Sequence, residues 1–245
     1  MALTSFGIGS PVGLLLNIVA TAGPSIAAVA LASILGRSEL RELLAGFSIS
    51  RLSARWAALA VALPLAMIAV AIAVAVAFLG SPSPTLTLGV VGVLLVEFVR
   101  VLFLGGPLEE ELGWRGFALP RLQGRLAALE ASILLGVIWG LWHIPLYFVP
   151  GTGQFETIAA GTDPAFAIGG FIGWTIGLSV LFTWLFNQTR ASLLVVMLFH
   201  AAVNLGAFLP SAVGSAGAAS LLYVVVTWLV AAVVAIRFGR RTLAL

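Results

Sequence analysis

Arginine positions divide this chain into long apolar stretches, and that pattern restricts it to one class of fold. All 12 basic residues are Arg, and none is Lys. The stretches between them approach the ~20 residues that an α-helix needs to cross a bilayer. Only 9% of the chain is charged, against roughly 25% in soluble domains. The sequence therefore predicts an all-α polytopic membrane protein.

We expect the spans and one shorter helix to form a bundle of about eight helices, in a single membrane domain over residues 1–245. Running the spans up and down places four arginine-bearing segments on one side, and the loops opposite carry no basic residue. The positive-inside rule then puts the arginine-rich loops and the C-terminus in the cytoplasm, with the protein in the cell (inner) membrane. The expected spans are 10–36, 56–79, 85–105, 127–149, 165–186, 191–211 and 217–236.

The arginine-bearing segments are 37–55, 106–126, 187–190 and the C-terminal tail. Because the basic residues follow these membrane edges rather than gathering in one patch, a nucleic-acid partner is not expected. The chain has no Cys, which excludes a disulfide, a thiolate nucleophile and a sulfur-ligated metal. The absence of Lys and the abundance of Ala suggest a bacterial genome rich in GC.

Glycine and proline predict some local features of the spans. Pro24 falls in the middle of the first span and should kink or split it. The pair Gly136 and Gly140 indicates a face where two helices pack closely, and so does the series Gly169, Gly173 and Gly177.

The segment 106–126 interrupts the regular pattern of spans, since it is too polar and too short to cross lipid unaided. Pro107 suits a first helical position, and acids in a first turn complement the helix dipole. We therefore expect a motif-bearing helix at 107–122 that enters from the cytoplasmic side and is sheltered by the other spans.

Acidic residues dominate the start of this motif helix. Glu111 and Arg115 are four apart, so they share a face and can form an ion pair. Glu110 is rotated about 100° away and is left free for another task. Glu109 is expected to be a cytoplasm-facing charge. The purely structural explanation is an acidic helix start with one surface ion pair.

Both histidines of the chain lie inside apolar runs. His143 follows Trp139 by one helical turn and precedes Pro145, so it should lie near a distortion of its helix. His200 and Asn204 are also one turn apart and share a face. A lone histidine in a membrane often only bonds a neighbouring helix, but ionisable groups that cluster at membrane depth indicate function.

Such a cluster can hydrolyse a bond. A carboxylate and an imidazole that share one water can withdraw its proton and direct the resulting nucleophile at a carbonyl carbon. A second imidazole and a side-chain amide can donate hydrogen bonds to the resulting oxyanion. The same groups also resemble a zinc site, for which Glu110, His143 and His200 would be the ligands. Spacing alone leaves both mechanisms open.

Three short motifs occur in order on separate helices of this eight-helix pattern. The combination resembles the CPBP family of intramembrane endopeptidases, which includes the CAAX prenyl proteases and the bacteriocin-processing or self-immunity (ABI-type) proteins. The motifs are Glu-Glu-x-x-x-Arg at 110–115, aromatic-x-x-x-His at 139–143 and His-x-x-x-Asn at 200–204.

The resemblance also implies roles. Glu110 and His143 correspond to the activators of the attacking water, and His200 with Asn204 to the oxyanion hole. Glu111 and Arg115 correspond to an orienting pair. The chain departs from the family at Trp139, where Phe is usual, so the pocket beside His143 is reshaped. We count Trp139 with the residues that orient the site or contact substrate.

The sequence thus predicts an intramembrane endopeptidase that hydrolyses a peptide bond of a membrane-associated peptide or protein. We expect no cofactor, because Asn is a poor zinc ligand and a good oxyanion donor; zinc-dependent hydrolysis is the second hypothesis. The buried charged groups would also suit a proton-coupled transporter, and the scaffold would suit a non-catalytic bacteriocin-immunity or binding protein. The sequence identifies neither the substrate, prenylated CAAX proteins included, nor the oligomeric state.

Overall fold

The computed structural model describes residues 13, 15 and 19–244, and the elements identified in it are all helical. The all-α class is therefore confirmed. The elements are α2 (Gly23–Leu35), α3 (Arg37–Ala45), η2 (Ile49–Arg51), α4 (Ala54–Leu79), α5 (Leu88–Leu104), α6 (Pro107–Glu111), η3 (Leu112–Ala118), α7 (Leu119–Gln123), α8 (Ala128–Trp142), η4 (Ile144–Phe148), α9 (Gly153–Ala159), α10 (Pro164–Gln188), α11 (Leu193–Ala212) and α12 (Ala218–Phe238).

In the described part of the chain, 6 helices are long and apolar enough to cross a membrane. Together they make this a multi-pass membrane protein. The first expected span, 10–36, is represented there by the shorter apolar helix α2, and the rest of that span lies partly outside the described residues. A turn at Ala22 precedes α2, which has Pro24 in its first turn, so the proline splits this segment as predicted.

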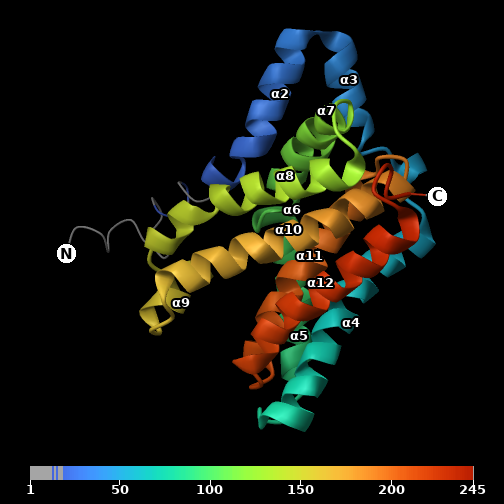
Figure 1. Ribbon diagram of the computed structural model, residues 1–245. Coiled ribbons are helices and arrows are strands. Elements are labelled where there is room, and N and C mark those ends of the chain that lie inside the picture. The colour runs from blue at the N-terminus through green and yellow to red at the C-terminus, as the bar shows by residue number, and fades with distance from the viewer. Residues whose placement is uncertain (1–12, 14, 16–18, 245) are drawn as a thin grey trace.

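Two groups of helices diverge from a common centre, and α2 and α3 form a hairpin that projects away from both (Figure 1). One group contains α4, α5, α11 and α12, and the other contains α8 and α10 with α9 at its tip. Helix α11 is central, since 67% of its most apolar window is buried inside the protein. In contrast, the corresponding window of the stretch Leu88–Gln123 is 0% buried, which leaves α5 facing outward.

Close contact between α8 and α10 depends on two glycines. A Cβ at Gly136 would lie 2.6 Å from the Ile176 Cα, and one at Gly140 would lie 3.0 Å from the Ile172 Cα. The prediction of close packing is confirmed at this pair. It was wrong for Gly169 and Gly173, where a Cβ would meet nothing within 4 Å.

Local signals explain where two central spans begin. Asp163 caps α10 by accepting a hydrogen bond from the Phe166 N–H at 2.9 Å, and Ser192 caps α11 in the same manner. Such caps satisfy backbone N–H groups that the first helical turn leaves unpaired.

Loops that were predicted to share one side of the membrane are joined by hydrogen bonds. The Arg51 side chain reaches the Ala191 carbonyl, Gln123 bonds Asn187, and Asn187 reaches the Thr242 carbonyl. At the opposite end, the Thr85 N–H donates to the Val213 carbonyl. The alternation of the spans is therefore present in the fold.

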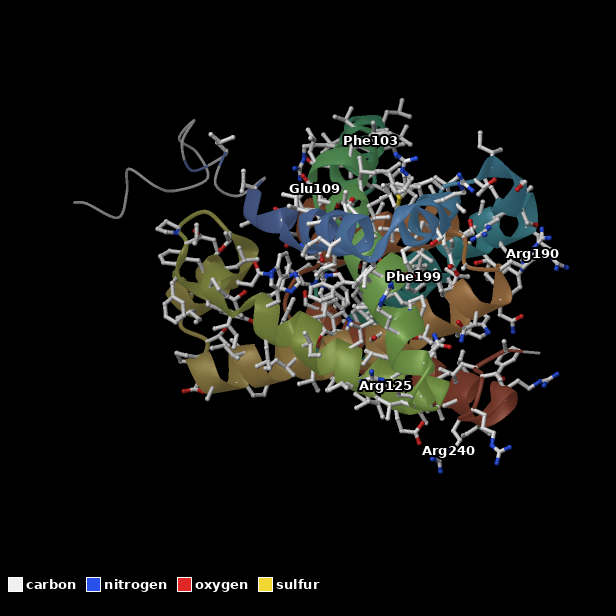
Figure 2. All side chains as sticks on the ribbon, turned by 90° about the horizontal axis from the view of Figure 1, so that it is seen from above. Phe103, Glu109, Arg125, Arg190, Phe199 and Arg240 are labelled. Carbon is white, nitrogen blue, oxygen red and sulfur yellow. The ribbon has the colours of Figure 1, made fainter. Side chains whose placement is uncertain are left out.

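Exposed arginines accompany these joined loops. Arg125, Arg190 and Arg240 lie at the edge of the protein, while Phe199 of α11 lies in its interior (Figure 2). This distribution fits charged groups at the membrane edges around an apolar centre.

Candidate active site

The motif-bearing helix expected at 107–122 is helical from Pro107 to Gln123, and it continues α5 after a bend at Gly105 and Gly106. Its middle segment η3 is a π-helix rather than the regular α-helix expected. Such widened turns are rare and occur often at functional sites.

Glu109 has a structural role that differs from the one predicted. Its Oε2 accepts a hydrogen bond from the Gly106 N–H at 2.9 Å, which caps the start of α6. Glu109 thus also caps a helix, a role that its sequence position had not suggested, and its orientation toward the cytoplasm stays a prediction. A residue three positions into a helix commonly returns to the N-cap in this way.

Glu111 and Arg115 form the ion pair that their spacing predicted, with 2.8 Å between Glu111 Oε1 and Arg115 Nη1. Both side chains are 0% exposed. The guanidinium carbon of Arg115 also lies 3.9 Å from the ring centroid of Phe182. The purely structural explanation, a surface ion pair, was therefore wrong, because this pair is entirely inside the protein.

His200 joins that pair from α11. Its Nδ1 lies 2.7 Å from Glu111 Oε1. Because a carboxylate can only accept, Nδ1 carries the proton. Glu111 thereby fixes the orientation of the His200 ring and leaves Nε2 as its other functional nitrogen.

Glu110 is the next carboxylate, and it is held by two tryptophans. Its Oε2 accepts from Trp139 Nε1 at 2.8 Å and from Trp114 Nε1 at 3.3 Å. Glu110 is thus not paired with Arg115, and the hydrogen bonds described for it leave Oε1 uncommitted. That oxygen faces Gly106, where a Cβ would lie 2.5 Å from it.

Gly106 therefore gives the Glu110 carboxylate room. Its φ of +112° is also a conformation that L side chains rarely adopt. Sequence reasoning missed both Gly106 and Trp114. The spacing of Glu110 and Trp114 was a usable signal, because residues four apart share a helix face.

His143 ends α8, where the chain passes into the 3₁₀-helix η4 that contains Pro145. The predicted distortion near the proline is confirmed. The His143 Nδ1 lies 2.8 Å from the Trp139 carbonyl oxygen, so Nδ1 donates and a neutral ring keeps its lone pair on Nε2. The ring packs against Trp142 and Phe171, with centroids 4.9 and 5.0 Å away.

Trp139 connects the predicted site residues. Besides bonding Glu110 and His143, its ring lies 5.7 Å from that of His143 and 5.5 Å from that of His200. The fold thus brings Glu110, His143 and His200 together around one indole that is 3% exposed.

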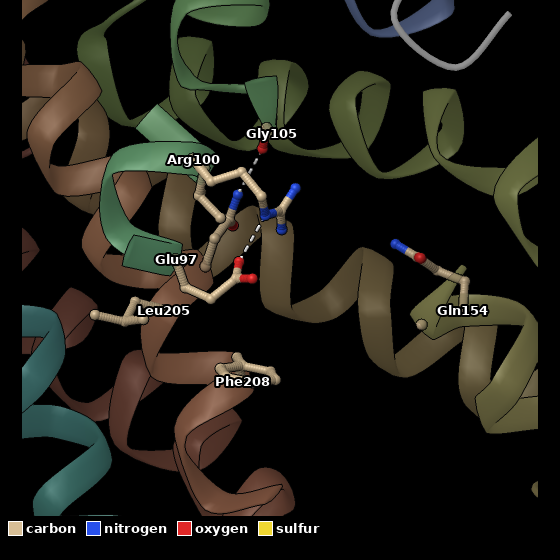
Figure 3. A pocket seen from close by; sticks show the side chains of 9 residues that line it. Glu97, Arg100, Gly105, Gln154, Leu205 and Phe208 are labelled. Carbon is tan, nitrogen blue, oxygen red and sulfur yellow. Dashed lines mark hydrogen bonds and ion pairs between the residues drawn. The ribbon is translucent and has the colours of Figure 1, made fainter. Parts of the chain in front are cut away.

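Asn204 lies at the edge of this cluster, one turn beyond His200. Its Nδ2 donates to the Gly105 carbonyl at 3.1 Å, which leaves the second amide N–H available. The half-buried side chain of Asn204 also lines a pocket of about 410 Å³ between α5, α11 and α9 (Figure 3).

The described residues do not bring three or more His, Asp or Glu side chains into a group that could hold a metal ion. One nitrogen of each histidine is already used, by Trp139 and by Glu111. Each histidine keeps Nε2, and a metal-bound histidine commonly donates its other ring N–H to a carboxylate or a carbonyl, so zinc-dependent hydrolysis with Glu110, His143 and His200 as ligands stays the second hypothesis.

The segment that carries these residues is similar to known proteins. Residues 94–206 match the family profile described as type II CAAX prenyl endopeptidase Rce1-like. A curated relative, CAAX prenyl protease 2 of Methanococcus maripaludis, is 37% identical over 111 residues. That alignment covers 44% of this chain and 40% of the relative. The chain therefore matches less than half of the relative's length.

The matched segment 94–206 contains Glu110 to Arg115, Trp139 to His143 and His200 to Asn204, which are all three motifs. The resemblance to the CPBP family of intramembrane proteases is thereby confirmed over the segment that builds the site.

Proposed function

We propose that this chain is an intramembrane endopeptidase that hydrolyses a peptide bond of a membrane-associated peptide or protein. The observation that supports it best is the meeting of Glu110, His143 and His200 at Trp139, inside a helix bundle. Buried ionisable groups are costly in a membrane and are rarely gathered without a function.

Glu110 and His143 are the proposed bases. The two indole N–H groups hold one oxygen of Glu110, so the other oxygen and the free Nε2 of His143 are the basic atoms that remain. Together they withdraw a proton from one water, whose oxygen attacks the carbonyl carbon of the scissile bond. The same proton then passes to the leaving amine as the C–N bond breaks.

Asn204 and His200 are the proposed donors to the oxyanion. Asn204 donates through the amide hydrogen that Gly105 does not use. His200 donates from Nε2 only as an imidazolium, in which both ring nitrogens carry protons. Glu111 and Arg115 orient that ring through the 2.7 Å contact with Nδ1.

A peptide tethered to the membrane is the proposed class of substrate, because the site lies within a bundle of apolar helices. The name of the archaeal relative refers to prenylated CAAX proteins, so lipidated peptides are the first substrates to test. The arginine-bearing loops place the motif helix toward the cytoplasm in the proposed orientation.

The test uses the purified chain in proteoliposomes with internally quenched peptides, each lipidated at one cysteine. Wild type and Glu109→Gln should release fluorescence at comparable rates, whereas Glu110→Gln should not. Mass spectrometry of the products identifies the bond that is cut. Equal cleavage by Glu110→Gln, with the fold of both variants intact, would show that Glu110 is not the base.

A further inference from the structure

A second charged pair lies in α5, outside the site described above. Arg100 Nε donates to Glu97 Oε2 at 2.7 Å, toward the C-terminal end of the apolar helix α5. Ionisable residues in such segments usually face a cavity or a partner rather than lipid. Both residues line the pocket of about 410 Å³ that Asn204 also lines.

Arg100 presents an open hydrogen-bonding edge to this pocket. Only its Nε is engaged, by Glu97, and no hydrogen bond from either terminal nitrogen to the described residues is found. Figure 3 shows the two terminal nitrogens pointing away from Glu97, across the pocket toward the side where Gln154 lies. The Arg100 side chain is 53% exposed, so a ligand can reach it.

Polar and apolar groups share the wall of this pocket. Val101, Leu205 and Phe208 supply apolar surface, while Gln154 and Asn204 supply amides. The volume is near the lower end of the ~300–1,000 Å³ typical of sites for small ligands. A short peptide segment has the matching mixture of side chains and backbone polar groups.

We propose that Arg100 binds the C-terminal carboxylate of the peptide substrate. A guanidinium presents two parallel N–H donors that fit a carboxylate bidentately. Glu97 holds the Nε side of the guanidinium and so directs the terminal nitrogens into the pocket. This assignment rests on the proposed function, because it takes the bound peptide to be the substrate of a protease. The binding that it predicts is measured without hydrolysis.

The pocket also sets a length for the bound segment. Gly105, whose carbonyl Asn204 holds, lies five residues after Arg100, a rise of roughly 7.5 Å along a helix. An extended peptide advances about 3.3 Å per residue. Because Arg100 and Asn204 line the same pocket, a chain end at Arg100 places one of its last few peptide bonds near Asn204, which is the proposed oxyanion donor.

Glu97 also favours a carboxylate over a phosphate. A phosphate monoester carries up to two negative charges near neutral pH, and the Glu97 carboxylate beside Arg100 repels the second. A phosphate monoester is consequently the poorer ligand for this position, whereas a phospholipid diester carries one negative charge and has to be distinguished by experiment.

The test compares two probes, dansyl-Ala-Val-Leu with a free C-terminal carboxylate and the same peptide with a C-terminal amide. Fluorescence anisotropy measures their binding to Glu110→Gln protein in a neutral detergent, so that hydrolysis does not consume the probes. We expect the free acid to bind roughly 10-fold more tightly than the amide or better, as a charge-assisted hydrogen-bonded pair allows. Adding Arg100→Gln should abolish this preference and leave binding of the amide nearly unchanged.

Arg55→Gln is the matched control, because Arg55 is an exposed arginine beside Trp56, away from the pocket. It should keep the preference for the acid. Glu97→Gln keeps Arg100 and removes the nearby negative charge, so it should strengthen binding of the acid and provides a second test if Arg100→Gln does not fold.

A preference for the acid that survives Arg100→Gln would overturn the assignment. So would displacement of the acid by phosphatidylglycerol, which would identify a lipid headgroup as the anion. Neither result concerns hydrolysis, which the comparison of Glu109→Gln with Glu110→Gln decides separately.

Discussion

Two glutamate–arginine pairs lie on the same helical stretch from Leu88 to Gln123. They have similar nitrogen–oxygen distances but differ in how far their side chains are exposed. Glu97–Arg100 and Glu111–Arg115 have nitrogen–oxygen distances of 2.7 and 2.8 Å. The arginine and glutamate of the first pair are 53% and 28% exposed, whereas those of the second pair are both 0% exposed. Similar short-range spacing has thus produced one open pair and one enclosed pair.

Their surroundings explain the difference. Glu111 also bonds His200, and Arg115 lies over the rings of Phe182 and Trp139. The buried pair is therefore part of a network with His200 and two aromatic rings, although Glu111 Oε2 and Arg115 Nε and Nη2 have no hydrogen-bond partner among the described residues. Arg100, in contrast, keeps two exposed nitrogens for a ligand. An ion pair in this protein acquires its role from the neighbouring helices.

The largest effect should come from the bases beside the buried pair. We expect Glu110→Gln and His143→Ala each to reduce the rate of peptide cleavage by roughly 10⁴-fold, the upper end of what a positioned acid–base group contributes. Circular dichroism should show an unchanged helix content. If Glu109→Gln proved as damaging as Glu110→Gln, the assignment of roles along α6 would be wrong.

Replacing the two arginines tests the comparison of stability directly. Arg115→Met should destabilise the protein by about 3–5 kcal/mol, because it leaves Glu111 charged, buried and without its partner. Arg100→Met should cost about 0–1 kcal/mol, as expected for an exposed pair. Thermal unfolding in detergent measures both, and equal losses would contradict the division into open and enclosed pairs.

Asn204 lies between the two regions, since it contacts Gly105 and lines the pocket of Arg100. Asn204→Ala should slow turnover by roughly 10²- to 10³-fold, the usual effect of losing one oxyanion donor. The loss should appear in kcat. A change confined to KM would indicate instead that Asn204 only shapes the pocket.

A smaller effect is expected at Trp139, the aromatic residue of the aromatic-x-x-x-His motif. Trp139→Phe keeps a ring but removes the 2.8 Å hydrogen bond to Glu110, while Trp114 still donates. Loss of one such charge-assisted bond should reduce kcat/KM by roughly 10-fold. Trp56→Phe, in a ring pair with Trp184, is the control and should leave kcat/KM unchanged.

The smallest effect should come from removing metal. Because the described residues present no set of three or more His, Asp and Glu ligands, we expect chelators such as 1,10-phenanthroline to leave cleavage intact. Activity that disappears with the chelator and returns with added zinc would show that the site rearranges to bind metal.

Local spacing predicted much of the site, and long-range packing supplied the remainder. The Glu111–Arg115 pair follows from a separation of four residues on one helix. The bond between His200 and Glu111 joins residues 89 positions apart, and the one between Trp139 and Glu110 joins residues 29 apart. No periodicity in one helix encodes such contacts, because they depend on how separate helices pack.

The same limit applies to the fold. Apolar lengths predicted the spans, and arginine positions predicted which loops meet. They did not predict the π-helical turn of Leu112–Ala118, which leaves the hydropathy of the segment unchanged while altering its hydrogen bonding.

That widened turn has a consequence for how the motif helix can tolerate changes in length. A π-turn accommodates one extra residue within a helix, so the residues beyond it are out of phase by about 100° with a regular helix. The acidic start of the motif helix faces the histidines, and its far end carries Arg121, which pairs with Glu39 on α3. The π-turn therefore sets the rotation between these two ends apart from that of a regular helix. Deleting one residue between 112 and 118 would restore regular phase and force one end to lose its partners.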